Sequence, residues 1–179
     1  MAQSMHRFEV SLADTDRSVY AELAFRLVRH PSETPSYLIT RALALCICHE
    51  EGLRATAGIC EGDEPALEVR DATQRRTHWV DVGRPGPAHV QRGLRDCERV
   101  SLLTTRPPQE VLRILEAADV RLLKRLEILG LDEALVSGLA EGLDRRNVWS
   151  VTVSGGQVYV DNEGAVLQGA LSRLLGGGD

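Results

Sequence analysis

Three acidic residues stand at positions where carboxylates can do chemistry. Asp81 lies inside a strand-like run, Asp63 comes just before another such run, and Glu33 precedes an apolar helix-like segment. Aspartate is depleted in strands, so Asp81 calls for a reason beyond local propensity. Carboxylates that converge offer the hard oxygen ligands that Mg²⁺ requires. The alternatives are a turn role for Asp63 and a favourable interaction of Glu33 with a helix dipole.

The composition is that of a globular protein. The chain has 179 residues, of which 43% are hydrophobic and 26% charged, so we expect one domain over residues 1–179. No apolar run approaches the roughly 20 residues that span a bilayer, and the first residues do not form a secretory signal. We therefore expect a cytoplasmic protein with no membrane partner. The net charge of -5 argues against strong nucleic-acid binding, although a local basic patch would be compatible with it.

Several chemically capable side chains have structural interpretations. The cysteines have no metal-binding spacing, and we expect them to be small buried residues in a reducing compartment; they are Cys46, Cys48, Cys60 and Cys97. Trp79 and Trp149 are expected to pack in the core or at a sheet edge. The pair Arg75 and Arg76 falls at a predicted hairpin tip, where a solvated turn is favoured over a phosphate contact.

The elements that must position these residues follow from hydrophobic periodicity. Residues 6–12 and 20–28 alternate between apolar and polar side chains, which predicts a hairpin of two strands. Thr34 and Pro35 form a typical helix start. The segment after them is apolar almost all round, which predicts a buried central helix over about 35–50 that is stopped by Gly52.

The rest of the chain alternates between short strands and helices. Strands are predicted at 53–59, 66–70, 77–83, 100–104 and 126–129, and helices at 87–97, 108–117 and from Asp132 to about 143. A final hairpin joins 148–153 to 158–160 through the turn SGGQ. The pattern predicts an α/β (α+β) protein with a mixed sheet and flanking helices. Its middle, about 35–104, reads helix, strand, strand, strand, helix, strand.

Three blocks of sequence carry a family resemblance. They are RHPSET at 29–34, GICEGDEP at 58–65 and WVDVGRP at 79–85. In order and spacing they resemble the conserved blocks of the YaeQ family, and the similarity runs to about Gly164. The resemblance implies a variant of the PD-(D/E)XK nuclease fold, in which the core at about 35–104 is extended by additional N- and C-terminal strands.

The resemblance also implies a site. Asp63 and Asp81 take the positions of the two acidic residues of the nuclease motif, and Glu33 takes that of a third carboxylate, so all three become candidate Mg²⁺ ligands. The chain departs from the motif at Gly83, where a lysine is expected. Arg92, or alternatively Arg84, would then supply the missing cation. An arginine binds phosphate well but cannot act as a general base, because its pKa exceeds about 12.

Two functions remain open at this point. The first is a Mg²⁺-dependent nuclease or phosphodiesterase in which Arg92 clamps the phosphate beside Asp63, Asp81 and Glu33. The second is a non-catalytic regulatory protein that binds nucleic acid or another protein on a degenerate nuclease fold. The missing lysine and the negative net charge favour the second function, and the retained carboxylates favour the first.

Overall fold

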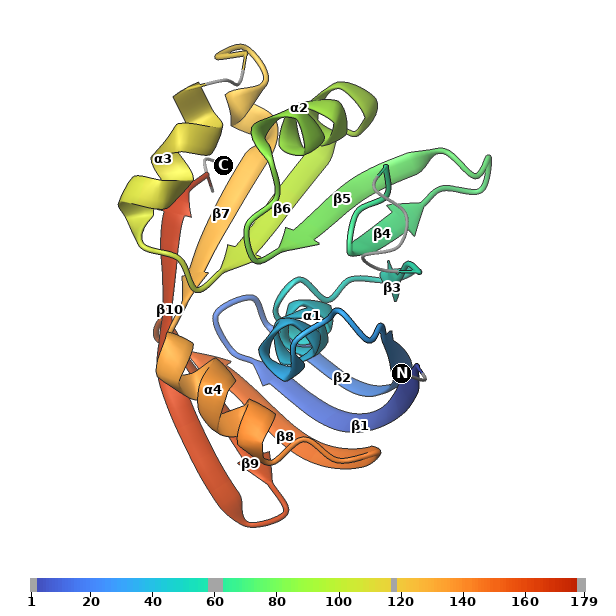
Figure 1. Ribbon diagram of the computed structural model, residues 1–179, viewed down its shortest axis with the longest axis vertical. Coiled ribbons are helices and arrows are strands. Elements are labelled where there is room, and N and C mark those ends of the chain that lie inside the picture. Colours follow the sequence, from blue (N-terminus) through green and yellow to red (C-terminus); the bar gives the residue numbers. More distant parts are fainter. Residues whose placement is uncertain (1–2, 58–62, 117–118, 177–179) are drawn as a thin grey trace.

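The computed structural model describes residues 3–57, 63–116 and 119–176 (Figure 1). In this part of the chain the strands are β1 (Ser4–Asp14), β2 (Val19–Arg29), β3 (Arg54–Ala55), β4 (Leu67–Arg70), β5 (Arg76–Val82), β6 (Arg99–Thr104), β7 (Leu126–Leu131), β8 (Arg146–Ser154), β9 (Gln157–Asn162) and β10 (Ala165–Leu175). The helices are α1 (Pro35–Ile47), α2 (Pro87–Asp96), α3 (Pro108–Glu116) and α4 (Glu133–Glu141), with a 3₁₀ turn at Leu123–Arg125. None of these helices is long and apolar enough to span a membrane.

The strands form one mixed sheet in the order β2-β1-β8-β9-β10-β7-β6-β5-β4-β3. The sheet curves around α1, and its two edge strands, β2 and β3, both contact this helix (Figure 1). Strand β10 joins the two halves, because residues 165–170 pair with β9 while residues 171–175 pair with β7. The fold is therefore a mixed α+β fold with a large, nearly closed sheet and few helices.

Helix α1 is the centre of the larger hydrophobic core. The Thr34 side chain accepts a hydrogen bond from the backbone N–H of Tyr37, and every residue from Leu38 to Ile47 is buried. The predicted buried helix is confirmed, but it ends at Ile47 and does not reach residue 50. The reason is tertiary: Arg17, from the turn between β1 and β2, donates to the carbonyls of Cys46 and His49 and so satisfies the end of the helix.

Helices α2 and α3 cover the opposite face of β5, β6 and β7. Strand β5 shows the division, since Val80 and Val82 pack in the core around α1 while Trp79 packs in a second core with Val90 and Leu94 of α2. The strand is thus buried on both faces, which explains why its apolar run is nearly continuous. Trp79 and Trp149 are both fully buried, as expected from the sequence.

The structure shortens one predicted strand and adds one strand that was not predicted. The strand expected at 53–59 is reduced to β3, because β4 begins only at Leu67 and leaves two residues to pair with; residues 58 and 59 lie outside the described part. Strand β10 has no counterpart among the predicted elements. Its middle holds Gly169, where an added Cβ would lie 2.7 Å from the Cβ of Asp132 and 2.8 Å from that of Leu135. The glycine permits this close approach of α4 rather than breaking the strand.

Candidate functional site

Asp81 is held inside a cage of hydrogen-bond donors. Its carboxylate accepts from the indole Nε1 of Trp79 at 2.6 Å and from the backbone N–H of Ala66 at 3.3 Å, and His89 Nε2 lies 3.2 Å away. Only 5% of the residue is exposed. A buried carboxylate requires such partners, and here a neighbouring strand and helix α2 supply them.

The close packing of α2 on Trp79 sets this geometry. Proline at the start of the helix pre-organises its first turn, and Gly93 faces the indole so closely that an added Cβ would lie 2.9 Å from the ring. The His89 ring then meets Trp79 edge-on, with centroids 5.0 Å apart. The glycine therefore lets α2 approach the sheet and brings His89 to Asp81.

Asp63 lies in the turn before β4 and is open to solvent, with 81% of its side chain exposed. Its carboxylate forms an ion pair with Arg92 of α2. Arg92 and His89 stand three residues apart on one helix, so they share a face. Both aspartates therefore contact the same face of α2, although one is buried and the other is at the surface.

Glu33 has a different environment in the loop before α1. It forms a buried ion pair with Arg41, with Oε1 3.0 Å from Nη1, and both side chains are 1% exposed. Its other oxygen accepts from the backbone N–H of His30 at 3.0 Å. The aromatic ring of Tyr37 lies near this pair and near Asp81: burial raises the pKa of Tyr37 to about 12, Arg41 acts against that rise, and the two carboxylates add to it.

The described residues do not form a set that fits a divalent metal. Across residues 3–57, 63–116 and 119–176, no three His, Cys, Asp or Glu side chains lie close enough together to hold one ion. Asp81 is surrounded by N–H donors, and Glu33 and Asp63 are each paired with an arginine. N–H donors occupy the oxygen atoms that Mg²⁺ would need.

Backbone geometry explains why this chain has Gly83 at the position where a lysine was expected. Gly83 has a φ of 78°, in the left-handed region, and an added Cβ would lie 3.6 Å from the Tyr37 ring. A lysine in this conformation would be strained. Arg84 does not replace it, since its guanidinium is 3.8 Å from Glu110 of α3. Of the two candidate cations, Arg92 is the one that meets a predicted carboxylate, Asp63.

Glu68 of β4 is a further member of this region that sequence reasoning missed. It accepts hydrogen bonds from Arg54, Arg70 and Arg76, at 3.0, 2.8 and 2.7 Å. Arg76 also lies over the Trp79 ring at 5.1 Å, so the prediction of a solvated turn is wrong for Arg76, while Arg75 is exposed. A carboxylate between two apolar residues of a strand is the same clue that singled out Asp81.

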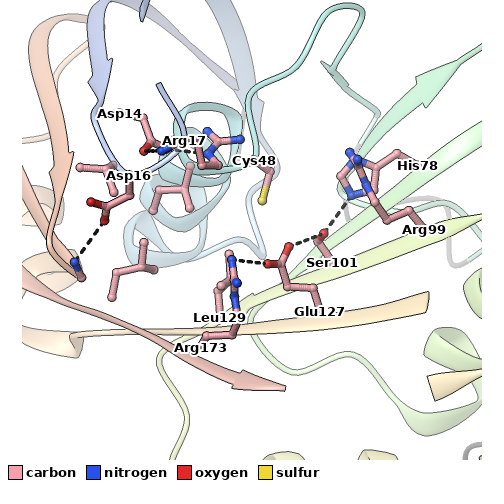
Figure 2. Close-up of a pocket in the computed structure, with 14 residues that line it drawn as sticks. Asp14, Asp16, Arg17, Cys48, His78, Arg99, Ser101, Glu127, Leu129 and Arg173 are labelled. Atoms are coloured by element: carbon pink, nitrogen blue, oxygen red, sulfur yellow. Dashed lines mark hydrogen bonds and ion pairs between the residues drawn. The ribbon is translucent and has the colours of Figure 1, made fainter. Parts of the chain in front are cut away.

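A second polar region lines a cavity of about 310 Å³ on the α1 side of the sheet (Figure 2). His78 Nε2 lies 2.9 Å from Ser101 Oγ, which donates to Glu127 at 3.5 Å, and Glu127 pairs with Arg173 at 3.0 Å. These side chains come from four neighbouring strands, β5, β6, β7 and β10, and form one row across the sheet. No sequence pattern pointed to this region.

Cysteine chemistry is not prominent in either region. Cys46, Cys48 and Cys97 are free and buried, as predicted, and Cys60 lies outside the described residues. Burial raises the pKa of Cys48, which lines the cavity, to about 12. The Cys48 thiol is therefore neutral at physiological pH and is a poor nucleophile.

The fold is a mixed sheet curled around one buried helix, with ionised groups on both faces of its central strands. These features place the chain in the α+β class. The sequence profile of the family described as "YaeQ protein" matches residues 1–170, and the chain belongs to this family. It is 25% identical over 162 residues to "Uncharacterized protein YaeQ" of Escherichia coli (strain K12), covering 89% of each chain. The corresponding protein of Salmonella typhi is 24% identical over 160 residues, covering 89% of this chain and 88% of its own.

Solved structures with the same fold carry the same family name. The chain is similar to the crystal structure of YaeQ protein from Pseudomonas syringae, with a TM-score of 0.84 and 30% identity over 98% of this chain and 97% of the other. The fold also matches that of YaeQ protein from Xanthomonas axonopodis pv. citri, with a TM-score of 0.90 and 23% identity over 98% and 100% of the two chains.

Proposed function

We propose that this YaeQ-family chain is a non-catalytic binding protein built on a PD-(D/E)XK-like core. The observation that carries the proposal is the state of the three predicted carboxylates. Asp81 is enclosed by N–H donors, Glu33 is buried against Arg41, and Asp63 is paired with Arg92. The carboxylates act as anchors for their own neighbours, so each has a structural role that needs no metal ion.

The order of the elements supports the nuclease-like core. α1, β3, β4, β5, α2 and β6 follow one another as the family resemblance implies. β3, β4 and β5 are antiparallel neighbours, and β6 runs parallel to β5. A fold of this kind does not imply the activity, which must be argued from the site.

The partner of such a protein would meet the surface around α2 and the β4–β5 hairpin. This surface carries exposed guanidinium groups, including those of Arg54, Arg75 and Arg92, beside exposed carboxylates such as Glu98 and Asp63. Mixed charges favour a selective polar contact over nonspecific attraction to a polyanion. A regulatory protein partner, or a short nucleic-acid segment, fits this surface better than long duplex DNA.

A Mg²⁺-dependent nuclease is the second candidate, and one observation favours it. His89 and Arg92 lie on one face of α2 and contact Asp81 and Asp63 respectively. The same helix thus presents a cation and an imidazole to both aspartates of the predicted motif. Release of these contacts by a divalent ion and a phosphate would be required for that activity.

A cleavage assay distinguishes the two functions. Single- and double-stranded DNA and RNA are incubated with the protein in Mg²⁺ or Mn²⁺, comparing the wild type with Asp81→Asn, Asp63→Asn and Arg92→Gln. Glu141→Gln, at an exposed position of α4, serves as the matched control. We expect equal background cleavage in all five proteins, and retained binding of partner or oligonucleotide without cleavage.

The opposite result in this assay would establish the nuclease function. Wild-type cleavage that each of the three site substitutions lowers by more than about tenfold, or about 1.4 kcal/mol in the barrier, would overturn the binding-protein proposal. Calorimetric titration with Mn²⁺ gives an independent readout. Binding that is lost in Asp81→Asn and kept in Glu141→Gln would locate a metal at the predicted site.

A further inference from the structure

The cavity beside the C-terminal end of α1 belongs to neither of the functions above. It lies on the α1 face of the sheet, whereas Asp81 contacts α2 on the other face. Its volume is about 310 Å³, close to the lower limit of small-molecule sites. At about 30 Å³ per water molecule this is room for about ten waters, or for one ligand of amino-acid size.

The floor of the cavity is apolar. Ile47, Leu129, Val153 and Leu171 contribute aliphatic side chains from α1, β7, β8 and β10. Cys48 adds a neutral thiol to this wall (Figure 2). An aliphatic group of a few carbon atoms would bury its surface here at a gain of about 0.8 kcal/mol for each CH₂ group.

The rim of the cavity carries both signs of charge. Arg99 and Arg173 stand on one side with Glu127 between their strands, and Asp16 stands on the other, in the turn between β1 and β2 (Figure 2). Arg17 is not available to a ligand, because it pairs with Asp14 at 2.6 Å and donates to the carbonyls at the end of α1. The remaining guanidinium and carboxylate groups define what the cavity can recognise.

The rim keeps both hydrogen-bond donors and hydrogen-bond acceptors that a ligand could use. In the part of the chain that the structure describes, Arg99 and Arg173 use Nη2 for their contacts with Glu50, His78 and Glu127, which leaves Nε and Nη1 of each guanidinium. Within the described residues, Asp16 accepts hydrogen bonds from the backbone N–H groups of Gly155 at 2.8 Å and Gly156 at 3.2 Å and forms no ion pair. A carboxylate has about four acceptor sites, and two remain on Asp16.

We propose that this cavity binds a small zwitterion, a molecule with one carboxylate, one ammonium group and a short aliphatic side chain, as in a free α-amino acid. The carboxylate lies toward Arg99 and Arg173, and the ammonium group toward the opposite side of the rim, where Asp16 stands. The aliphatic side chain packs on Leu129 and Leu171. A purely anionic or purely cationic molecule leaves one side of the rim with an unmatched charge, and this mismatch provides the selectivity.

Isothermal titration calorimetry with three matched probes tests the proposal. L-leucine carries both charges, 4-methylpentanoate lacks the ammonium group, and 3-methylbutan-1-amine lacks the carboxylate. We expect L-leucine to bind at one site and both analogues to bind at least about tenfold more weakly. L-valine and L-methionine extend the zwitterion series to shorter and longer side chains.

Variants locate the binding in this cavity. Arg173→Gln removes a guanidinium whose side chain is 52% exposed, and Leu171→Phe fills the floor. Both should weaken L-leucine binding by about tenfold or more, while Arg113→Gln, an exposed arginine of α3 on the opposite face, should leave it unchanged. Circular dichroism checks the fold of each variant, and Arg173→Gln decides the question where Leu171→Phe does not fold.

Three results would overturn the proposal. They are the absence of binding by all three amino acids at millimolar concentration, equal affinity for L-leucine and its singly charged analogues, and an unchanged L-leucine affinity in Arg173→Gln. The outcome is independent of the cleavage assay, because the two sites share no residue.

Discussion

Glu68 should be one of the largest electrostatic contributors to stability in this protein. The perturbation is Glu68→Gln, which keeps the shape of the side chain and removes its charge. Burial of the carboxylate raises its pKa, but the hydrogen bonds from Arg70, Arg76 and Arg54 outweigh this effect and lower the pKa from 4.5 to about 2. The ionised form is therefore strongly favoured in the folded protein.

The magnitude follows from this pKa. A fall from 4.5 to about 2 corresponds to about 3 kcal/mol at about 1.4 kcal/mol per pKa unit. Solvent screens part of the interaction because the Arg54 side chain is 59% exposed. We therefore expect Glu68→Gln to lower the free energy of unfolding by about 2 kcal/mol near neutral pH.

The pH dependence has a defined sign. Because the folded-state pKa is depressed, the contribution of Glu68 is complete above pH 4.5 and is lost as the pH falls toward about 2. Urea denaturation of the wild type and of Glu68→Gln across this window should show the difference in stability closing at low pH. The matched control is Glu98→Gln, whose pair with Arg75 spans 3.8 Å between side chains that are 69% and 63% exposed, and it should change stability by less than about 0.5 kcal/mol.

The reasoning would be refuted by a Glu68→Gln variant as stable as the wild type near neutral pH. A stability difference that is the same at pH 2 and pH 7 would also refute it, since the loss would then come from packing and not from the charge. Equal effects in Glu68→Gln and Glu98→Gln would show that the three-arginine contact adds nothing beyond an ordinary surface pair.

Three further predictions concern the core and its pH response. Leu45→Ala should cost about 2 to 5 kcal/mol in chemical denaturation, since Leu45 of α1 is 5% exposed, and a loss below about 0.5 kcal/mol would contradict the central place of α1. Gly93→Ala should destabilise by about 1 to 3 kcal/mol, because the new Cβ would meet the Trp79 ring at 2.9 Å; Gly86→Ala, with no atom within 4 Å, should cost less, and reversed costs would refute this packing. Burial lowers the pKa of His78 below 6.5, so its neutral form contributes stability that is complete above pH 6.5 and lost as the pH falls. Thermal unfolding of the wild type should show this loss as the pH falls. The same pH dependence of the melting temperature in His78→Gln would contradict the prediction.

The elements with a strong local pattern were predictable. Alternation over 6–12 and 20–28 gave the β1–β2 hairpin, and the two central glycines of SGGQ adopt the positive φ values of 59° and 72° that a tight hairpin turn requires. Gly52 has the positive φ of 82° that favours glycine, but α1 ends at Ile47, before the stop expected at Gly52. These features depend on periodicity and backbone sterics, which act within a few residues of one another.

The site was only partly predictable, because the sequence identifies candidate carboxylates but not their surroundings. Asp81 stood out as an aspartate in an apolar strand, and it is indeed buried there. Its partners come from its own strand, from the backbone just before β4 and from α2, and Glu33 meets Arg41, eight residues further along, inside the core. Three carboxylates can bind one metal ion together, or each can contact separate protein groups. Which of the two occurs depends on interatomic distances, which packing sets.

The sequence by itself determined the family, the central helix and the order of helices and strands, because these follow from motif blocks and from hydrophobic periodicity along the chain. The tertiary structure alone decided that the sheet curls around α1 through the bent strand β10, and that Gly169 and Gly93 serve close helix contacts. It alone assembled the row from His78 to Arg173, whose members are up to 95 positions apart. The physical reason is that periodicity reports which face of an element is buried, whereas charge pairing and cavity shape depend on which elements meet.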